Sequence, residues 1–231
     1  MRPLAALALA AVIGAAPLPV FAKEAPAPVI ETTPMPSDMP AVSDVPNVIT
    51  VPDMPKSGDY TLDKGHANLT FRVNHLSYSY YLGRFNEFDA KLTFDAKNPA
   101  NSKVTATLTT ASVDTNNEVL EGKLKADDWL DAKKFPAITF VSKDVKITSA
   151  TGGTVTGDLT LHGVTKPVTL DVTLVGYGYN TYSQADTVGF SATGKLNRSD
   201  FGITNLVPKV GDEVTFTFDG EFNLIPAAAN E

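Results

Sequence analysis

Apolar and polar residues alternate along many short segments between residues 60 and 224, which is the pattern of β-strands with one buried face. In the segment ANLTFRVNH, residues 67–75, one face carries Leu69, Phe71, Val73 and His75. Similar faces are predicted by Phe88, Ala90, Leu92 and Phe94, by Val104, Ala106 and Leu108, and by Val214, Phe216, Phe218, Phe222 and Leu224. Thr215 and Thr217, on the opposite face of the last segment, are expected to face solvent.

Turn residues separate these segments, among them Asn98-Pro99, Gly152-Gly153 and Gly211-Asp212. Short alternating strands with turns between them predict an all-β, antiparallel fold. Such a fold hides its apolar face in a sandwich or in a closed barrel of about eight strands. The inward positions mix phenylalanine with small residues, namely Ala90, Ala106, Gly157, Ala192 and Gly194. This mixture favours a barrel with a hollow interior.

The stretch DTNNEVLEGKLKADDWLDAKKFP, residues 114–136, breaks the alternation. Leu120 and Leu124 are spaced as i and i+4, acidic residues lie near the start, and Pro136 ends the stretch. We therefore expect one or two short helices here, lying over one opening of the β-structure.

The two ends of the chain lack the alternating pattern. Arg2, an apolar run and the small-residue site Val20-Phe21-Ala22 predict a secretory signal peptide over residues 1–22. Residues 23–58 hold eight of the 16 prolines and no aromatic residue, which predicts a disordered linker. The folded domain is expected over residues 59–226, followed by a disordered tail at 227–231.

The chain has 231 residues, a formal net charge of −7 and no cysteine. The acidic balance argues against nucleic acid and against an anionic membrane surface as partners. No run after the signal peptide approaches the roughly 20 apolar residues of a membrane span. Export without cysteine suits a bacterial periplasm, where we expect the protein to reside. The oligomeric state stays open, and a homodimer is one alternative.

Three histidines, His66, His75 and His162, are the first candidates for chemistry. A zinc site needs several N, S or O ligands. With no cysteine, and with His66 and His75 of opposite parity on a continuous strand, we expect no metal site. No G-x-S-x-G motif is present, so we also expect no catalytic residue and no cofactor. His162 either satisfies the backbone of the turn that Gly163 builds or hydrogen-bonds a quinone carbonyl or amide at the barrel rim. Arg198 is interpreted as a brace at a strand end rather than as a contact to an anionic head group.

Four blocks of sequence resemble the YceI-like family of polyisoprenoid-binding proteins: FRVNH at 71–75, FPAITFVS at 135–142, GDLTLHGVTKPV at 157–168 and NRSDFG at 197–202. Their order and spacing are similar too. The resemblance implies an antiparallel, lipocalin-like β-barrel with a helix near one opening. It also implies a long amphiphilic or isoprenoid ligand threaded into the barrel of a periplasmic protein.

The chain departs from the family pattern at two positions. The family usually has serine or a similar hydroxyl residue after the first histidine, where this chain has Ala67 after His66. The family often has a histidine before the helix, where this chain has Lys123. Both positions are ones at which the resemblance would place a ligand head group.

We expect the ligand to contact the inward-facing apolar residues together with two histidines and the tryptophan. The expected set is Phe71, Val73, His75, Phe88, Leu92, Phe94, Trp129, Phe140, Leu159, Leu161, His162, Phe190, Phe216 and Phe218. The expected function is that of a periplasmic carrier, not an enzyme, that sequesters a long-chain isoprenoid such as a quinone, a quinone precursor or a polyprenyl lipid. One alternative is an enzyme acting on such a lipid, with His75 or His162 as general base. Another is a filled barrel that serves as an envelope interaction module through the proline-rich segment.

Overall fold

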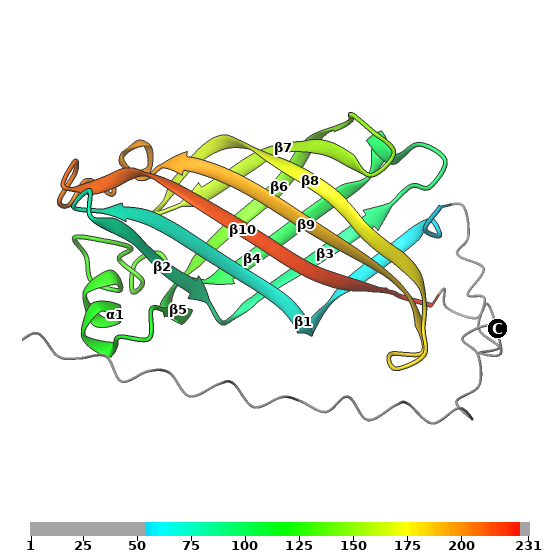
Figure 1. Cartoon of the computed structure of the whole chain (residues 1–231), viewed down its shortest axis with the longest axis horizontal. Coiled ribbons are helices and arrows are strands. Elements are labelled where there is room, and N and C mark those ends of the chain that lie inside the picture. Colours follow the sequence, from blue (N-terminus) through cyan, green and yellow to red (C-terminus); the bar gives the residue numbers. More distant parts are fainter. Residues whose placement is uncertain (1–53, 227–231) are drawn as a thin grey trace, which may run out of the picture. The chain divides into compact units, whose positions relative to one another are not determined.

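The computed structural model describes residues 54–226, which form a closed antiparallel β-barrel with one short α-helix (Figure 1). The predicted signal peptide, the proline-rich segment up to residue 53 and the tail 227–231 lie outside the described residues. Eight strands form the barrel wall: β1 (Gly58–His75), β3 (Phe88–Phe94), β4 (Lys103–Thr109), β6 (Ala137–Ile147), β7 (Gly152–Leu161), β8 (Val164–Asn180), β9 (Ala185–Asn197) and β10 (Val210–Leu224). The barrel closes because β1 pairs with both β3 and β10, so the predicted fold class is confirmed.

On the side away from β10, strand β1 pairs with two different strands. Its first residues, Gly58–Thr61, pair with β3, and its last residues, from Thr70 onward, pair with β2 (Ser79–Phe85). The register of β1 against β10 shifts between Leu62 and Ala67, so extra residues are accommodated where the strand bends away from β3. The short strand β5 (Val113–Asp114) pairs with the end of β2.

The stretch predicted to be helical forms one helix, α1 (Glu118–Leu124), and turns after it. The Asn117 side chain caps this helix by accepting a hydrogen bond from the backbone N–H of Leu120 at 3.1 Å. A second helix does not form in residues 125–136, where Asp131 has a φ of +44° that helical backbone does not adopt. Three short 3₁₀ turns complete the described chain: η2 (Pro99–Asn101), η3 (Thr110–Ser112) and η4 (Arg198–Phe201). None of the helices within residues 54–226 has the length and apolar character needed to cross a membrane.

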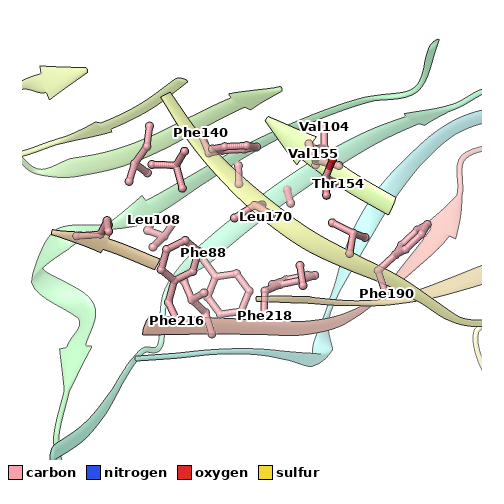
Figure 2. Close-up of a pocket in the computed structure, with 18 of the residues that line it drawn as sticks. Phe88, Val104, Leu108, Phe140, Thr154, Val155, Leu170, Phe190, Phe216 and Phe218 are labelled. Carbon is pink, nitrogen blue, oxygen red and sulfur yellow. The ribbon is translucent and has the colours of Figure 1, made fainter. Parts of the chain in front are cut away.

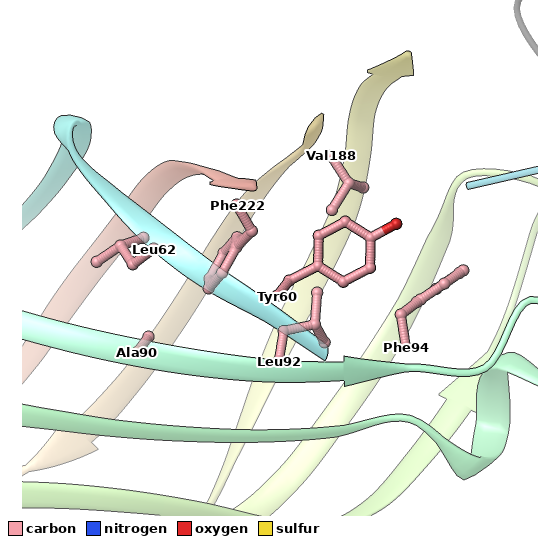
Figure 3. Close-up of a cluster of buried hydrophobic side chains, with 7 residues drawn as sticks. All are labelled: Tyr60, Leu62, Ala90, Leu92, Phe94, Val188 and Phe222. Atoms are coloured by element: carbon pink, nitrogen blue, oxygen red, sulfur yellow. The ribbon is translucent and has the colours of Figure 1, made fainter. Parts of the chain in front are cut away.

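Two buried clusters pack the two ends of the barrel. We call the end where β1 begins and β10 finishes the terminal end, and the end where α1 and η4 lie the helix end. The terminal cluster is shown in Figure 3 and consists of Tyr60, Leu62, Ala90, Leu92, Phe94, Val188 and Phe222. The cluster at the helix end consists of Ile138, Leu161, Val168, Phe201 and Ile203.

The residues just before β1 belong to the barrel as well. Tyr60 is almost completely buried. Its hydroxyl group donates a hydrogen bond to the carbonyl oxygen of Lys56 at 2.7 Å. The Lys56 ammonium group lies 2.8 Å from a carboxylate oxygen of Asp186 in β9. Residues 54–58, which the sequence assigned to the disordered linker, are therefore held against the terminal end.

Candidate functional site

A cavity of about 520 Å³ lies inside the barrel. It borders Leu92 and Phe222 of the terminal cluster and Ile138 and Leu161 of the cluster at the helix end. Figure 2 shows aromatic and aliphatic side chains lining it from several strands. The labelled apolar members of this wall are Phe88, Val104, Leu108, Phe140, Val155, Leu170, Phe190, Phe216 and Phe218.

Several phenyl rings of the wall lie over glycine positions. A Cβ atom placed on Gly194 would lie 2.5 Å from Cζ of Phe216, its cross-strand partner in β10. A Cβ atom on Gly157 would lie equally close, 2.5 Å, to Cζ of Phe140 in β6. The rings thus fill the space that a side chain at each glycine would need, a known way of covering glycine in sheets. Rings held against the wall leave room in the middle of the barrel.

The exposure of the inward-facing residues shows where packing ends and the cavity begins. Phe216 and Phe218 face inward from β10 yet are only half-buried, because the space in front of them is open. Phe222, farther along the same face, is 3 % exposed within the terminal cluster. The barrel is therefore packed on the β1, β3, β9 and β10 side of its terminal end and hollow in its middle, as the mixture of small and aromatic residues predicted.

The cavity reaches solvent beside the terminal cluster, where the chain connects β3 to β4 and β6 to β7. Exposed residues border it there, including Met54, which is 40 % exposed. We define the open end as Met54, Pro99, Ser102, Lys103, Ser149, Ala150 and Thr151. At the helix end, Trp129 and Ile203 line the cavity, and the amide of Asn205 donates a hydrogen bond to Asp128 at 2.7 Å. That contact joins the two loops that cover this end.

Arg198 is buried, only 5 % exposed, inside the closure at the helix end. Its guanidinium group donates four hydrogen bonds of 2.8–3.0 Å to the backbone carbonyl oxygens of Ile203, Asn205, Val210 and Gly211. Burial lowers the pKa of Arg198, but an arginine side chain remains charged in proteins. Although Arg198 borders the cavity, its donors are directed to the loop between β9 and β10 and to the first two residues of β10. The structure therefore agrees with the brace that the sequence favoured.

Twelve of the fourteen residues expected to contact ligand line the cavity. They are Phe71, Val73, Phe88, Leu92, Phe94, Trp129, Phe140, Leu159, Leu161, Phe190, Phe216 and Phe218. His75 and His162 are not among the lining residues. Contact of the twelve with a ligand stays a prediction, but their convergence on one cavity follows the parity of the sequence pattern.

His75 and His162 lie elsewhere for separate reasons. The pairing of β1 with β10 shifts register between Val73 and His75, and the His75 ring lies beside Tyr81, 6.2 Å between ring centroids. His162 and Gly163 form the two-residue turn between β7 and β8, with φ values of +51° and +75°, the signs that a tight hairpin turn requires. Neither histidine therefore lies on the cavity wall, and contact of either one with a ligand stays a prediction.

A second, polar pocket of about 470 Å³ lies beside β1, β2 and β3. We call it the side pocket, and it is lined by Lys64, Ala67, Asn68, Leu69, Arg84, Phe85, Asn86, Glu87, Phe88, Asp89, Thr107 and Thr109. It includes Ala67, one of the two positions at which the chain departs from the family pattern, whereas Lys123 is exposed on α1. Sequence reasoning missed the rest of this pocket, because its polar residues lie on outward-facing positions of separate strands.

One group of metal-ligating side chains comes together within residues 54–226. Asp63, His66 and Glu221 each offer a ligand atom, and these atoms lie within 4.8 Å of one another. Nδ1 of His66 lies 3.0 Å from a carboxylate oxygen of Asp63, and the His66 side chain is 64 % exposed. This is an exposed ion-pair arrangement on the outer surface at the bend of β1, and it is apart from the cavity residues.

Comparison with known proteins places the chain in a family. A model of the YceI-like domain matches residues 60–222. Protein YceI of Escherichia coli is 45 % identical over 155 residues, which cover 66 % of this chain and 80 % of that protein. The crystal structure of the Campylobacter jejuni YceI protein is 33 % identical, with a TM-score of 0.60 over 72 % of this chain and 98 % of that one.

A polyisoprenoid binding domain from Saccharophagus degradans has the same fold, with a TM-score of 0.53 over 72 % of this chain and 98 % of that domain. Its sequence identity is 16 %, so this likeness concerns the fold alone. The family-model match and the identity to the two YceI proteins extend over nearly the whole barrel. The chain therefore belongs to the YceI-like domain family.

Proposed function

We propose that this protein is a periplasmic binding protein that holds a long-chain isoprenoid in the barrel cavity. The observation that carries the proposal is the cavity itself, which borders the packed clusters at both ends of the barrel and is walled by phenyl and aliphatic groups. Such a wall has few groups that could orient a polar metabolite, whereas it offers continuous contact to a hydrocarbon chain.

The energetics favour a chain of several isoprene units. Burial contributes about 0.8 kcal/mol per CH₂-sized group, so each five-carbon unit contributes roughly 3–4 kcal/mol before ordering costs. Lost ligand freedom and the ordering of side chains offset part of this gain. A chain of a few units can therefore bind tightly without strong polar contacts inside the barrel.

Two further observations support this ligand class and location. The sequence blocks around Phe71, Phe140 and Leu159 resemble those of polyisoprenoid-binding proteins, and the Saccharophagus degradans domain of the same fold is a polyisoprenoid binding domain. The N-terminal pattern of a charged residue, an apolar run and a small-residue site favours export to the periplasm.

Binding is favoured over the two alternatives by specific positions. The residues considered as general bases, His75 and His162, are not among the cavity-lining residues, so neither lies where it could take a proton from a bound chain. A filled barrel would bury Phe216 and Phe218 as fully as Phe222, whereas both are half-buried around open space.

Native mass spectrometry of the protein purified from its own periplasm tests the proposal. We expect an added mass equal to that of an isoprenoid, released when the protein is unfolded and identified by fragmentation. Protein that is recovered from the cytoplasm, or that carries only a water-soluble metabolite, would contradict the proposed function.

A further inference from the structure

The barrel wall is interrupted on one side of β1. β1 pairs with β3 only from Gly58 to Thr61, and its pairing with β2 begins at Thr70. In the segment between, Leu62 and residues 67–69 pair with β10 on the other side, but residues 62–69 have no strand partner toward β3 within the described part of the chain. Figure 1 shows β1 bending away from β3 at this place.

Side chains, not backbone hydrogen bonds, close the interruption. Leu69, Phe85 and Phe88 line both the barrel cavity and the side pocket, so these three side chains form the partition between the two spaces. Each is only half-buried. Rotamer changes of these residues could join the apolar cavity to the polar pocket without breaking a strand ladder. An amphiphile could then place its chain on one side of the partition and its polar group on the other.

Two cations and three carboxylates surround the side pocket, and both cations are paired. The Lys64 ammonium group lies 3.0 Å from an Asp89 carboxylate oxygen across the gap between β1 and β3. Nε of Arg84 donates to Oδ2 of Asp114 at 2.9 Å, and Glu87 adds a further carboxylate to the lining. Neither cation is therefore available to an incoming anion unless an existing pair is broken.

Asp114 adds negative charge beside the pocket over the whole physiological range. The backbone N–H of Asn116, the Asn86 amide and the Arg84 guanidinium group donate hydrogen bonds to its carboxylate, and together they lower the pKa of Asp114 to about 2. A phosphate placed in the side pocket would share it with the carboxylates of Glu87 and Asp89, and Asp114 would lie behind Arg84 and Asn86. A neutral hydroxyl, carbonyl or amide would instead find donors and acceptors on residues such as Asn68, Asn86 and Thr107.

From this geometry we propose that the side pocket binds the head group of the isoprenoid and selects a neutral, hydrogen-bonding head group over a phosphate. The inference rests on the proposed function, because it requires a chain in the barrel cavity. The chain would pass between β1 and β3 at Leu69, Phe85 and Phe88. The open end, with the exposed Lys103 on its rim, is the competing position for a head group.

Three probes that share one chain test the selection: phytol, phytyl phosphate and the hydrocarbon phytane. In native mass spectrometry competition with the full chain, we expect phytol to bind at least about tenfold more tightly than phytyl phosphate, which corresponds to about 1.4 kcal/mol. Equal or tighter binding of the phosphate would overturn the selection of a neutral head group. If phytane and phytol both fail to bind, the proposed function fails, and the head-group site fails with it.

A pair of matched variants tests the position. Asn68→Trp places a large side chain in the side pocket from an exposed position of β1, and Ala150→Trp does the same at the open end. We expect Asn68→Trp to weaken phytol binding about tenfold and to leave phytane binding unchanged, whereas Ala150→Trp, which lies at the open end of the chain cavity, should change the binding of both ligands by the same factor. The reverse result would place the head group at the open end and overturn the proposal.

Asp89→Asn tests the same site by a gain of phosphate binding rather than a loss of phytol binding. Asp89 is 49 % exposed and its substitution releases Lys64 from its ion pair, so the fold should tolerate the change. We expect this variant to bind phytyl phosphate about tenfold more tightly than the wild type, while binding of phytane, which has no head group, stays unchanged. A variant with unaltered phosphate affinity would show that the head group does not reach the side pocket.

Discussion

Nδ1 of His162 lies 3.1 Å from the carbonyl oxygen of Phe201, and this contact ties the turn between β7 and β8 to η4. A carbonyl oxygen can only accept, so Nδ1 carries the hydrogen and donates it. The His162 ring also packs edge-to-face on Phe135, 4.7 Å between ring centroids. Three segments far apart in sequence are thus joined at one residue, which gives His162 a structural role at the helix end.

Replacement of His162 should reduce stability more than it reduces ligand binding. His162→Ala removes one hydrogen bond and one aromatic contact, and we expect the free energy of unfolding to fall by about 1–3 kcal/mol. Urea denaturation with an unchanged m-value would measure the loss, and native mass spectrometry would report the bound lipid. Loss of lipid without loss of stability would show instead that His162 contacts the ligand.

The period-two pattern predicted the cavity wall well, because a strand with one buried face has little freedom of register. Phe216 and Phe218 line the cavity, and Thr215 and Thr217 on the opposite face of β10 do not. The same parity rule places Ala106 and Ala192 on the wall. Each of these assignments needs only local information, namely that the strand is continuous.

Features that depend on contacts between distant segments were not predictable in this way. The side pocket arises where β1 changes its partner from β3 to β2, and nothing in the residues of one strand specifies its neighbours. His162 was uncertain because its partner, Phe201, is 39 residues away. The histidine at position 75 has the parity of Val73, but a register shift at the end of β1 separates it from the cavity.

Arg198 should be one of the most sensitive positions in the chain. Arg198→Ala leaves four buried or partly buried backbone carbonyl oxygens without their donor, and we expect unfolding to become easier by about 3–5 kcal/mol. Arg198→Lys should rescue only part of this, because an ammonium group cannot reproduce the planar guanidinium geometry. Thermal unfolding gives the stability of both variants. A lysine variant as stable as the wild type would contradict the role of the Arg198 guanidinium group as a brace.

A tryptophan inside the barrel should exclude the ligand. Ala106→Trp and Ala192→Trp each place an indole ring in the cavity, and we expect at least about a tenfold loss of bound isoprenoid. The open space should keep the stability cost at or below the roughly 1–3 kcal/mol of overpacking. Lipid extracted from equal amounts of each purified variant gives the measurement.

Neighbouring threonines provide matched controls for these two variants. Thr105 and Thr193 adjoin Ala106 and Ala192 in sequence but are exposed on the opposite face of the same strands. Thr105→Trp and Thr193→Trp should therefore retain wild-type amounts of lipid. Equal lipid content in all four variants would mean that the chain does not occupy the cavity.

His66 should titrate above the ordinary range for histidine. The hydrogen bond that the His66 ring donates to Asp63, the charge of Asp63 and the charge of Glu221 raise the pKa of His66 from its usual 6.5, and the same hydrogen bond lowers the pKa of Asp63. The stabilising contribution of His66 is thus complete below its unfolded pKa and is lost as the pH rises through its folded pKa. That of Asp63 is present above its unfolded pKa and is lost as the pH falls through its folded pKa. The pair therefore contributes most to the stability of the fold in the mildly acidic window between the two transitions.

NMR titration of the His66 ring measures this shift directly and should show a midpoint above 6.5. Asp63→Asn should lower that midpoint more than Glu221→Gln does, since Asp63 both accepts the hydrogen bond of the His66 ring and carries the nearer charge. A midpoint unchanged by Asp63→Asn would contradict the ion pair at the bend of β1.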